Sequence, residues 1–463
     1  MTRPAFSPPP NQPGDFDAGL ARAGRAVQSG RYREARAALA ELEALARDDA
    51  HRLRRLGEIH SHMNRPADAG RCYARAVELA PDDGAAHYDL AAVSIALGRL
   101  DAAEAHFDRV IADAPRDWDA WANRSTLRRA TAERNHVAAL EQALAGAGDD
   151  ADAQIALGHA LAKELEDLGR HDEAFAHLKA AADARRARLS YRVADDVATM
   201  AAIADAFSAE RLASAPAAAP APGPIFVLGL PCSGTTLVDR ILSSHSAVTS
   251  LGEIQDFALA LIEGAAGARD KADLIRRSAA MDHEALGRAY LTRIADREPG
   301  APFAIDKTPL NFLYIGLIAL ALPTARIVHV RRGAMDGCYA MYKTLFRMGY
   351  PFSYDLGDLA AYRIAYDRLM THWRRALPGR MIEIDYEALI ADQEKESRTL
   401  VAACGLEWES ACLDFHANPA PVATASAVQV RAPIHDRSVG LWRRYERGLA
   451  PLADALRDAG IAL

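Results

Sequence analysis

A period of 34 residues runs through the N-terminal part of the chain. At this spacing a turn-forming residue, a small residue five positions later and a large side chain four positions after that recur. The turn residue can join two helices, the small residue lets them approach closely, and the large side chain fills the groove between them. The period therefore predicts a stack of helix pairs. The aligned positions are Gly30, Asn64 and Gly98; Ala35, Ala69 and Ala103; Leu39, Tyr73 and Phe107; Val77 and Ile111; and Pro81 and Pro115.

This pattern is typical of tetratricopeptide repeats, which stack side by side into an α-solenoid. We expect about four repeats within residues 16–190 and a further helix to about residue 208, so that residues 16–208 form the repeat domain. Solenoids present a concave surface that often binds peptides or proteins. The domain therefore predicts a protein or peptide partner. The alternative is a domain used only for packing or dimerisation, which leaves a homo-oligomer open.

Biased composition marks the other boundaries of the chain. Residues 1–15 are rich in proline and are expected to be disordered. Residues 209–223 are rich in alanine and proline and are expected to form a linker. In residues 224–463 short apolar runs alternate with helical patterns, which predicts a P-loop-like three-layer α/β domain with a mostly parallel sheet. The predicted strands are Ile225–Leu228, Phe303–Ile305, Arg326–Val330 and Met381–Ile384.

The composition also restricts the partners and the compartment. A net charge of −7 gives no sign of nucleic-acid binding, which normally shows as a basic balance. The five cysteines include no Cys-x-x-Cys pair, which argues against a zinc site and suggests a reducing compartment. The longest apolar run, Ile315–Leu322, is too short to cross a bilayer, and the first residues lack the apolar core of a secretory signal. We therefore expect a cytoplasmic protein with no membrane span, no metal and no nucleic-acid partner.

The stretch Pro224–Leu242 has the pattern of a strand, a tight glycine loop and a helix. Such a loop presents free backbone N–H groups and the positive end of the helix dipole, which suits a phosphate. Gly229 and Gly234 have the spacing of the Walker phosphate loop, but Thr235 stands where that pattern has lysine. The stretch therefore predicts a phosphate-binding loop without the kinase lysine. An ATP-dependent P-loop kinase is a minor alternative.

Further polar residues are expected to meet this loop. Ligands of parallel sheets bind at the carboxyl ends of the strands, and Lys307 and the pair Arg331 and Arg332 follow predicted strands directly. These cations indicate a polyanionic ligand. Glu253 follows the first helix of the domain and could act as a general base on an incoming hydroxyl. The set predicts group transfer from a phosphorylated donor.

Each of these residues also has a plain structural interpretation. Ser233 and the two threonines after Gly234 could only cap the helix, and Lys307 could form a surface ion pair. The two arginines could lie at a solvated strand end, and Glu253 taken alone carries little weight. Asp336 is expected to cap a helix that runs through Tyr342 rather than to contact a substrate.

Several short motifs follow one another along the second half of the chain. They are Pro231–Thr236, Gly252–Glu253, Asp306–Leu313, His329–Arg332 with Asp336, Asp385–Glu387, and Thr424–Arg431 leading to Ser438–Trp442. Together they resemble the motifs of sulfotransferases that use 3′-phosphoadenosine-5′-phosphosulfate. With the repeats included, nearly the whole chain resembles bacterial tetratricopeptide-repeat sulfotransferases, which are similar to tyrosylprotein sulfotransferases. Several motifs in the right order make this resemblance more specific than the loop alone.

The resemblance implies transfer of a sulfuryl group from this donor to a hydroxyl, with protein tyrosine as the implied acceptor and no metal. It implies that Glu253 deprotonates the acceptor and that Lys307 stabilises charge on the transferring group. Arg332 would grip the 3′-phosphate, and the residues after Thr424 would close over the nucleotide. The implied donor-binding residues are Cys232, Ser233, Gly234, Thr235, Thr236, Arg332, Tyr386, Arg431, Arg437 and Ser438.

Three sites depart from the family pattern. Cys232 stands where the family usually has a basic residue, and Gly333-Ala334 replaces the usual Asp-Pro. Ala340 stands where the family usually has the serine that binds the 3′-phosphate. Removing one electrostatic donor of this kind costs about 10²–10³ in rate. The alternative function is therefore a catalytically impaired sulfotransferase-like protein that serves in binding or as a scaffold.

Overall fold

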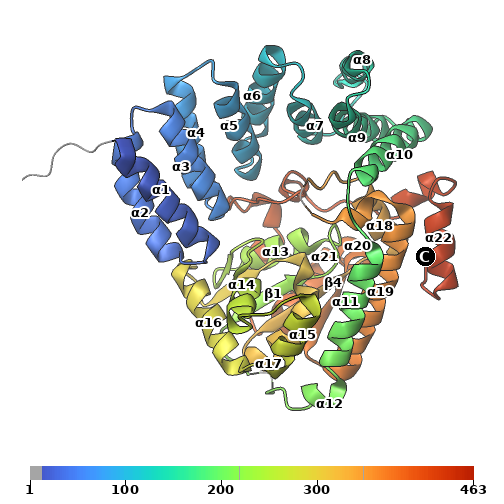
Figure 1. Ribbon diagram of the computed structural model, residues 1–463. Helices are drawn as coiled ribbons and strands as arrows, with labels where there is room; N and C mark the ends of the chain where they lie inside the picture. Colours follow the sequence, from blue (N-terminus) through green and yellow to red (C-terminus); the bar gives the residue numbers. More distant parts are fainter. Residues whose placement is uncertain (1–12, 218, 348) are drawn as a thin grey trace, which may run out of the picture.

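The N-terminal part of the chain is a stack of helix pairs. The computed structural model describes residues 13–217, 219–347 and 349–463 (Figure 1). Within them, four pairs, α1–α2, α3–α4, α5–α6 and α9–α10, succeed one another, with α7 and α8 between the third and fourth. The bounds are α1 Pro13–Gln28, α2 Tyr32–Ala46, α3 Ala50–His62, α4 Pro66–Leu79, α5 Gly84–Ala96, α6 Leu100–Asp113, α7 Trp118–Thr126, α8 Val137–Ala147, α9 Ala151–Asp167 and α10 His171–Ala187.

Helices are present at both ends of this stack, within segments that were expected to be disordered or a linker. Residues 1–12 of the expected disordered terminus lie outside the described residues, and α1 begins at Pro13. After the stack, α11 (Val193–Ala206) packs along α19 (Leu356–Ala376) of the second domain, as Figure 1 shows. The first residues of the expected linker form the short helix α12 (Ala209–Leu212).

A tight turn joins the helices of each pair at the repeated position. Gly30, Asn64 and Gly98 have φ angles of 68°, 58° and 73°. This left-handed region is accessible mainly to glycine and asparagine, which explains the residue types found there. Five residues later, each of the repeated alanines is fully buried between the helices of its pair. The structure thus supplies the physical basis of the 34-residue period.

The second domain contains a five-stranded sheet in the order β2-β3-β1-β4-β5, in which every neighbouring pair is parallel. Alternate side chains of β1 enter two apolar clusters: Phe226 and Leu228 face one, and Ile225 and Val227 face the other. Helices therefore cover both faces, which confirms the predicted three-layer fold. The strands are β1 Pro224–Leu228, β2 Val248–Ser250, β3 Phe303–Asp306, β4 Arg326–Arg331 and β5 Met381–Asp385.

The helices of this domain connect the strands in sequence. α13 follows β1 directly, α17 precedes β4, and α18 and α19 lie between β4 and β5. The bounds are α13 Thr235–Ser243, α14 Asp256–Gly264, α15 Lys271–Ala280, α16 His283–Asp296, α17 Ile315–Ala321, α18 Ala334–Tyr342, α20 Tyr386–Ala391, α21 Gln393–Ala403 and α22 Ala450–Asp458, with 3₁₀ helices η1 Pro309–Tyr314, η2 Pro351–Tyr354, η3 Ser410–Cys412, η4 Phe415–Ala417, η5 Gln429–Arg431 and η6 Leu441–Tyr445.

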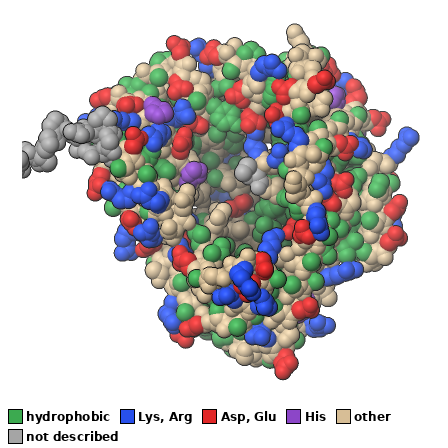
Figure 2. All heavy atoms as spheres, in the orientation of Figure 1, with side chains coloured by type: hydrophobic (Ala, Val, Ile, Leu, Met, Phe, Trp, Pro, Cys, Tyr) green, Lys and Arg blue, Asp and Glu red, His purple; other side chains and the backbone are tan. Residues whose placement is uncertain are grey.

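The segment from η4 to η6 runs between the repeat domain and the sheet (Figure 1). The backbone N–H of Val422 donates to the carbonyl of Ala96 at the end of α5, at 2.9 Å. On the other side, the buried Arg240 of α13 donates to the carbonyl of Ala420 at 3.0 Å. The segment is therefore fixed to both domains. Figure 2 shows that the surface is hollowed near this junction.

Candidate functional site

The loop between β1 and α13 forms the floor of the site. Gly229 and Gly234 have φ angles of 153° and 103°, and Gly234 directly precedes the first residue of α13. A Cβ atom on Gly234 would lie 2.5 Å from ring carbon Cδ2 of Tyr386. Glycine is thus required there by both the backbone and the close approach of the tyrosine. Ser233 is buried, and its hydroxyl has no hydrogen-bond partner within the described residues.

Arg332 connects the loop to the C-terminal segment and to α20. Its guanidinium donates to the carbonyl of Cys232 at 2.7 Å and to the carbonyl of Ser438 at 3.1 Å. It also lies over the ring of Tyr386, 4.6 Å from the ring centroid. The hydroxyls of Tyr386 and Ser438 are 3.0 Å apart. Residues from the β1 loop, the end of β4, α20 and the C-terminal segment therefore meet at one place, as the parallel topology predicted.

Arg331 does not join this group. Its side chain is half exposed and lies 3.4 Å from Glu383 of β5. Consecutive side chains of a strand point in opposite directions, so only one of the two arginines at the end of β4 can face the loop. The expectation that both arginines face the ligand is therefore wrong for Arg331.

Lys307 and Glu253 form an ion pair between the end of β3 and the loop after β2. The ammonium of Lys307 donates to Oε1 of Glu253. Lys307 is only 1 % exposed, so the surface-pair interpretation is wrong, whereas Glu253 is 42 % exposed and accessible to an acceptor. The backbone N–H of Lys307 also donates to the carbonyl of Gly252 at 2.9 Å. The carboxyl of Asp239 is close enough for the Lys307 charge to act on it. Burial raises the pKa of Asp239, and the charge of Lys307 partly offsets this by lowering it.

Asp336 lies in the first turn of α18 and caps a different element. Its carboxylate accepts hydrogen bonds from the backbone N–H groups of Gly440, at 2.5 Å, and Trp442, at 3.3 Å. These groups belong to the first turn of η6. Asp336 therefore fixes the C-terminal segment to α18, whereas the sequence led us to expect a cap on its own helix.

The two other C-terminal arginines occupy different environments. Arg431 donates to the carbonyl of Ala96 at 2.7 Å, and its side chain fills the space above Gly98 in the turn between α5 and α6. It contacts the repeat domain and is not part of the cavity wall. Arg437 is exposed and lines the cavity. Of these two residues, only Arg437 lines the cavity.

A cavity of about 1170 Å³ lies between the two domains. Of the twelve residues singled out in the sequence, eight line it: Cys232, Gly234, Thr235, Thr236, Arg332, Tyr386, Arg437 and Ser438. Ser233, Glu253, Lys307 and Arg431 lie outside its lining. Its opposite wall consists of repeat-domain residues, among them Arg129, Lys163 and Glu166. The repeat domain therefore forms part of the candidate site.

The carboxylates that line this cavity all have partners, whereas several of its arginines have no carboxylate partner among the described residues. The three carboxylates of its lining are all engaged: Glu166 with Lys343, Asp167 with Lys163, and Asp336 with backbone N–H groups. Four arginines of the lining have no carboxylate partner within salt-bridge distance among the described residues. They are Arg129, Arg332, Arg437 and Arg444. The cavity therefore suits an anionic ligand. Arg129 and Arg444 were missed from the sequence, because no local pattern marks them.

Cys232 and Ala340 are both part of the cavity lining. Cys232 has a φ angle of 61°, and its Sγ lies 3.7 Å from the hydroxyl of Thr344. Burial raises the pKa of the Cys232 thiol, which outweighs the opposite effect of that hydroxyl and of Arg332. The thiol is therefore neutral at physiological pH. The hydroxyl of Thr344 donates to the carbonyl of Ala340 at 2.7 Å, and its proton is therefore used in a hydrogen bond to the backbone of α18.

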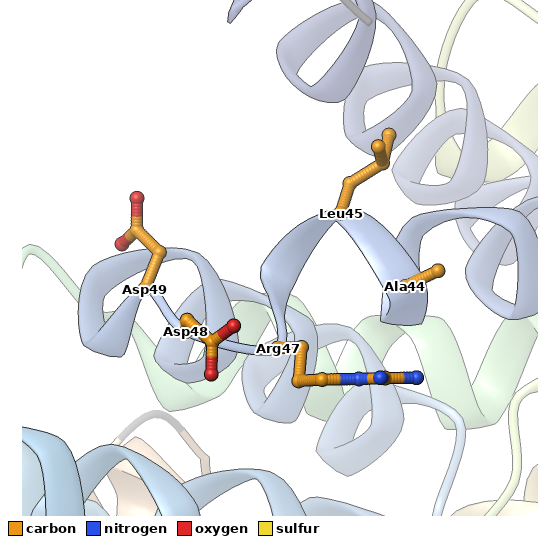
Figure 3. A pocket seen from close by; sticks show the side chains of 5 residues that line it. All are labelled: Ala44, Leu45, Arg47, Asp48 and Asp49. Atoms are coloured by element: carbon orange, nitrogen blue, oxygen red, sulfur yellow. The ribbon is translucent and has the colours of Figure 1, made fainter. Parts of the chain in front are cut away.

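A second, smaller hollow of about 440 Å³ lies at the turn between α2 and α3 (Figure 3). Its polar residues already have structural roles. Asp49 caps α3 by accepting from the N–H of Arg52, and Asp48 lies 3.6 Å from Arg75. This hollow is formed by Ala44, Leu45, Arg47, Asp48 and Asp49 alone and is no candidate for the chemistry.

The fold and the site define an α/β protein with a glycine loop at the N-terminus of a helix, beside a cavity whose other wall is a helical-repeat domain. Comparison with known families identifies two regions of the chain. Residues 224–410 match the sulfotransferase family, and residues 61–124 match the tetratricopeptide repeat. The second domain is therefore similar to sulfotransferases, and part of the first is similar to tetratricopeptide repeats. Within the described ranges, no helix is both long enough and apolar enough to cross a membrane.

Two curated relatives are similar to parts of the chain. An uncharacterized protein of Aquifex aeolicus (strain VF5) is 35% identical over 252 residues, which is 52% of this chain; the chain thus matches 33% of that protein's length. A Caenorhabditis briggsae protein with the provisional name protein-tyrosine sulfotransferase is 26% identical over 194 residues, 42% of this chain and 69% of that protein.

Solved structures similar to the two parts have low overall scores. The sulfotransferase domain from the curacin biosynthetic pathway has a TM-score of 0.34 and 15% identity, and covers 50% of this chain and 98% of that domain. The MamA protein has a TM-score of 0.31 and 18% identity, and covers 39% of this chain and 98% of that protein.

Proposed function

We propose that this protein transfers a sulfuryl group from 3′-phosphoadenosine-5′-phosphosulfate to a hydroxyl, with protein tyrosine as the acceptor class. The observation that carries the proposal is the cavity between the domains. Its carboxylates are all engaged, whereas four of its arginines have no carboxylate partner among the described residues. Such a lining favours a ligand with several negative charges. The match of residues 224–410 to the sulfotransferase family supports the reaction class.

The residues present fit the donor. Ser233 to Thr236, at the N-terminus of α13, would hold the 5′-phosphosulfate, since a buried free hydroxyl and a helix N-terminus both favour an anion there. Arg332 would hold the 3′-phosphate, because its buried Nε atom has no partner within the described residues. Tyr386, Arg437 and Ser438 would cover the nucleotide. Arg431 would act indirectly, by fixing the covering segment to the repeat domain.

The chemistry assigned to the chain is a single displacement. The donor, when bound, supplies the sulfuryl group and leaves as adenosine 3′,5′-bisphosphate. Glu253 takes the proton of the acceptor hydroxyl as the oxygen–sulfur bond forms, and the breaking bond leaves its electron pair on the phosphate oxygen. Lys307 lies against Glu253 and would stabilise charge on the transferring group. We expect EDTA to leave the rate unchanged, since in the proposed step Lys307 and the N–H groups of the loop, rather than a metal ion, balance the developing charge.

A second candidate function is binding without transfer. Cys232 places a neutral thiol where the family has a cation, and Ala340 offers no hydroxyl. Against this stands the position of two cations, Arg332 and Lys343, whose charges both act on the Cys232 thiol. We propose that these two cations supply the positive potential that the loop itself lacks.

A transfer assay separates the two functions. The full chain is incubated with ³⁵S-labelled donor and a pool of tyrosine-containing peptides, beside the variants Glu253→Gln and Cys232→Arg. We expect transfer by the wild type, a loss of about 10²–10³-fold in Glu253→Gln, and unchanged transfer in the control Glu298→Gln, a glutamate on the surface.

Two results would contradict the proposal that this protein is an enzyme. The first is no transfer by the wild type and none by Cys232→Arg, in which the family's cation is restored. The second is full transfer by Glu253→Gln, which would remove the proposed base. Binding of adenosine 3′,5′-bisphosphate without transfer in either form would establish the second candidate.

A further inference from the structure

The repeat domain contacts the sulfotransferase domain through its turns. The turn residues Gly30, Asn64 and Gly98 are 34 residues apart, and each lies against a different element of the second domain. At the first turn, Arg293 donates to the carbonyl of Ser29 at 2.7 Å. The three contacts therefore repeat along the solenoid with the period of the sequence.

Glycine at the first and third turns is explained by this contact. The space of a Cβ atom at Gly30 is filled by the guanidinium of Arg293, and that at Gly98 by the guanidinium of Arg431. In both cases the second domain supplies the side chain, and the turn supplies only a backbone carbonyl.

The second turn reverses this arrangement. Asn64 extends its own side chain to the second domain, and its Nδ2 donates to the carbonyl of Leu251 at 2.6 Å. Gly252 has a φ angle of 71°, and a Cβ atom there would lie 2.6 Å from the same Nδ2. A glycine at 252 is therefore what allows the amide to reach the backbone. Glu253, the proposed base, is the next residue.

The short segment before Glu253 is held from two sides. From the sheet side, the N–H of Leu251 donates to the carbonyl of Ile305, and the carbonyl of Gly252 accepts from the N–H of Lys307, both at 2.9 Å. From the repeat side, Asn64 holds the carbonyl between them. Within the described residues, Glu253 itself has Lys307 as its hydrogen-bond partner. Its orientation toward the acceptor thus depends on the backbone that Asn64 fixes.

We propose that Asn64 of the repeat domain is a positioning residue for Glu253, so that the solenoid takes part in catalysis. This inference rests on the proposed function. The turn itself does not need an asparagine side chain, because glycine forms the same turn at the two equivalent positions. The amide at position 64 is therefore explained by the segment it holds. A mispositioned catalytic group slows the reaction without weakening the binding of the donor.

The variant Asn64→Gly tests this role with the turn preserved. We expect kcat for transfer to tyrosine-containing peptides to fall on the order of tenfold, and the pH dependence of kcat to change on its acidic side. The affinity for adenosine 3′,5′-bisphosphate, measured by calorimetry, stays within about twofold, since Asn64 is not part of the cavity lining. Asn64→Asp has the same shape but no donor, and it is expected to lose as much activity.

The matched control is Arg293→Gln, which breaks the equivalent contact at the first turn, away from Glu253. It is expected to lower the melting temperature and leave kcat and its pH profile unchanged. Unchanged kcat and pH profile in Asn64→Gly would overturn the inference, and so would equal losses of kcat and of bisphosphate affinity. If the wild type transfers no sulfuryl group, the proposed function fails; if it does and Asn64→Gly matches it, only this inference fails.

Discussion

At the scale of single residues, the site combines a buried cation that is paired and buried polar groups that have no partner among the residues that the structure describes. Lys307 and Glu253 form a pair, whereas the hydroxyl of Ser233 and the Nε of Arg332 lack partners within the described residues. Leaving a buried donor unpaired costs about 1–3 kcal/mol, and a ligand that accepts from it recovers this energy. Of these two residues, Arg332 lines the cavity in which the donor nucleotide is proposed to bind.

One buried carboxyl beside the site makes the stability depend on pH. Burial raises the pKa of Asp306 to about 7, although Tyr290 and Asn311 donate to it. In the folded protein Asp306 therefore keeps its proton up to about pH 7, whereas in the unfolded chain it ionises near its ordinary pKa of about 4. Between these values the folded state binds more protons, so the contribution of Asp306 to stability decreases as the pH rises.

Asp306→Asn is expected to remove this contribution, because the amide does not titrate. The difference in unfolding free energy between wild type and variant should shrink as the pH rises from about 4 to about 7, by at most about 1.4 kcal/mol per pH unit. Denaturant unfolding at a series of pH values measures it. A difference that stays constant across this range would show that Asp306 titrates normally.

At the scale of secondary-structure elements, the C-terminal segment contributes a wall of the cavity and is fixed at a few points. Asp336 holds the first turn of η6, and Arg240 holds the segment near Ala420. Both are buried side chains that bond to backbone groups of an otherwise irregular segment. Hydrogen bonds to charged groups of this kind contribute about 1.5–3 kcal/mol each. These bonds act together with the apolar packing of Val422, Ala427 and Val430 against Ile95 of the repeat domain.

Asp336→Ala should loosen this segment. We expect trypsin to cut after Arg437 at least tenfold faster than in the wild type, and bisphosphate affinity to fall by about tenfold. Limited proteolysis followed by mass spectrometry locates the cut. Asp454→Ala, at the exposed pair with Arg457, serves as the control. Equal cleavage rates in wild type and Asp336→Ala would show that the carboxylate does not hold the segment.

The sequence predicted most elements because their signals are local. The glycine loop, four of the strands and the turns of the repeats follow from apolar runs and turn residues. The strand Val248–Ser250 was missed, since three residues give no periodicity. Arg331 and Asp336 were misjudged for a different reason. The partners that decide their roles, Glu383 and Gly440, are far away in the sequence.

At the scale of the whole molecule, the two domains share one site. Glu166 of α9 accepts hydrogen bonds from Tyr339 at 2.5 Å and Tyr445 at 2.9 Å and pairs with Lys343 at 2.6 Å. Burial alone would raise the pKa of Glu166, but these three partners outweigh it and lower the pKa. Arg297 of the second domain likewise pairs with the buried Asp256 and lies over the ring of Tyr32 in α2. Docking therefore involves buried charged side chains: Glu166 finds these partners in the second domain, and Arg297, paired within its own domain, contacts Tyr32 of the repeat domain.

The placement of one domain on the other could not be predicted from the sequence. The repeat period fixes the shape of the solenoid but says nothing about which face meets the sheet. That face is decided by side chains such as Asn64 and Glu166, which bond to the second domain but are not marked by the repeat pattern. For the same reason, the site predicted from the sequence did not include the repeat-domain residues that line the cavity.

The central claim is that the cavity between the domains binds a nucleotide with a 3′-phosphate, and calorimetric titration tests it most directly. Adenosine 3′,5′-bisphosphate and AMP are titrated into the wild type, Arg332→Gln and the control Arg331→Gln, whose arginine faces Glu383 instead. The account predicts that wild type and control prefer the bisphosphate at least tenfold, and that Arg332→Gln loses this preference. Equal affinity of the wild type for both nucleotides, or an unchanged preference in Arg332→Gln, would contradict it.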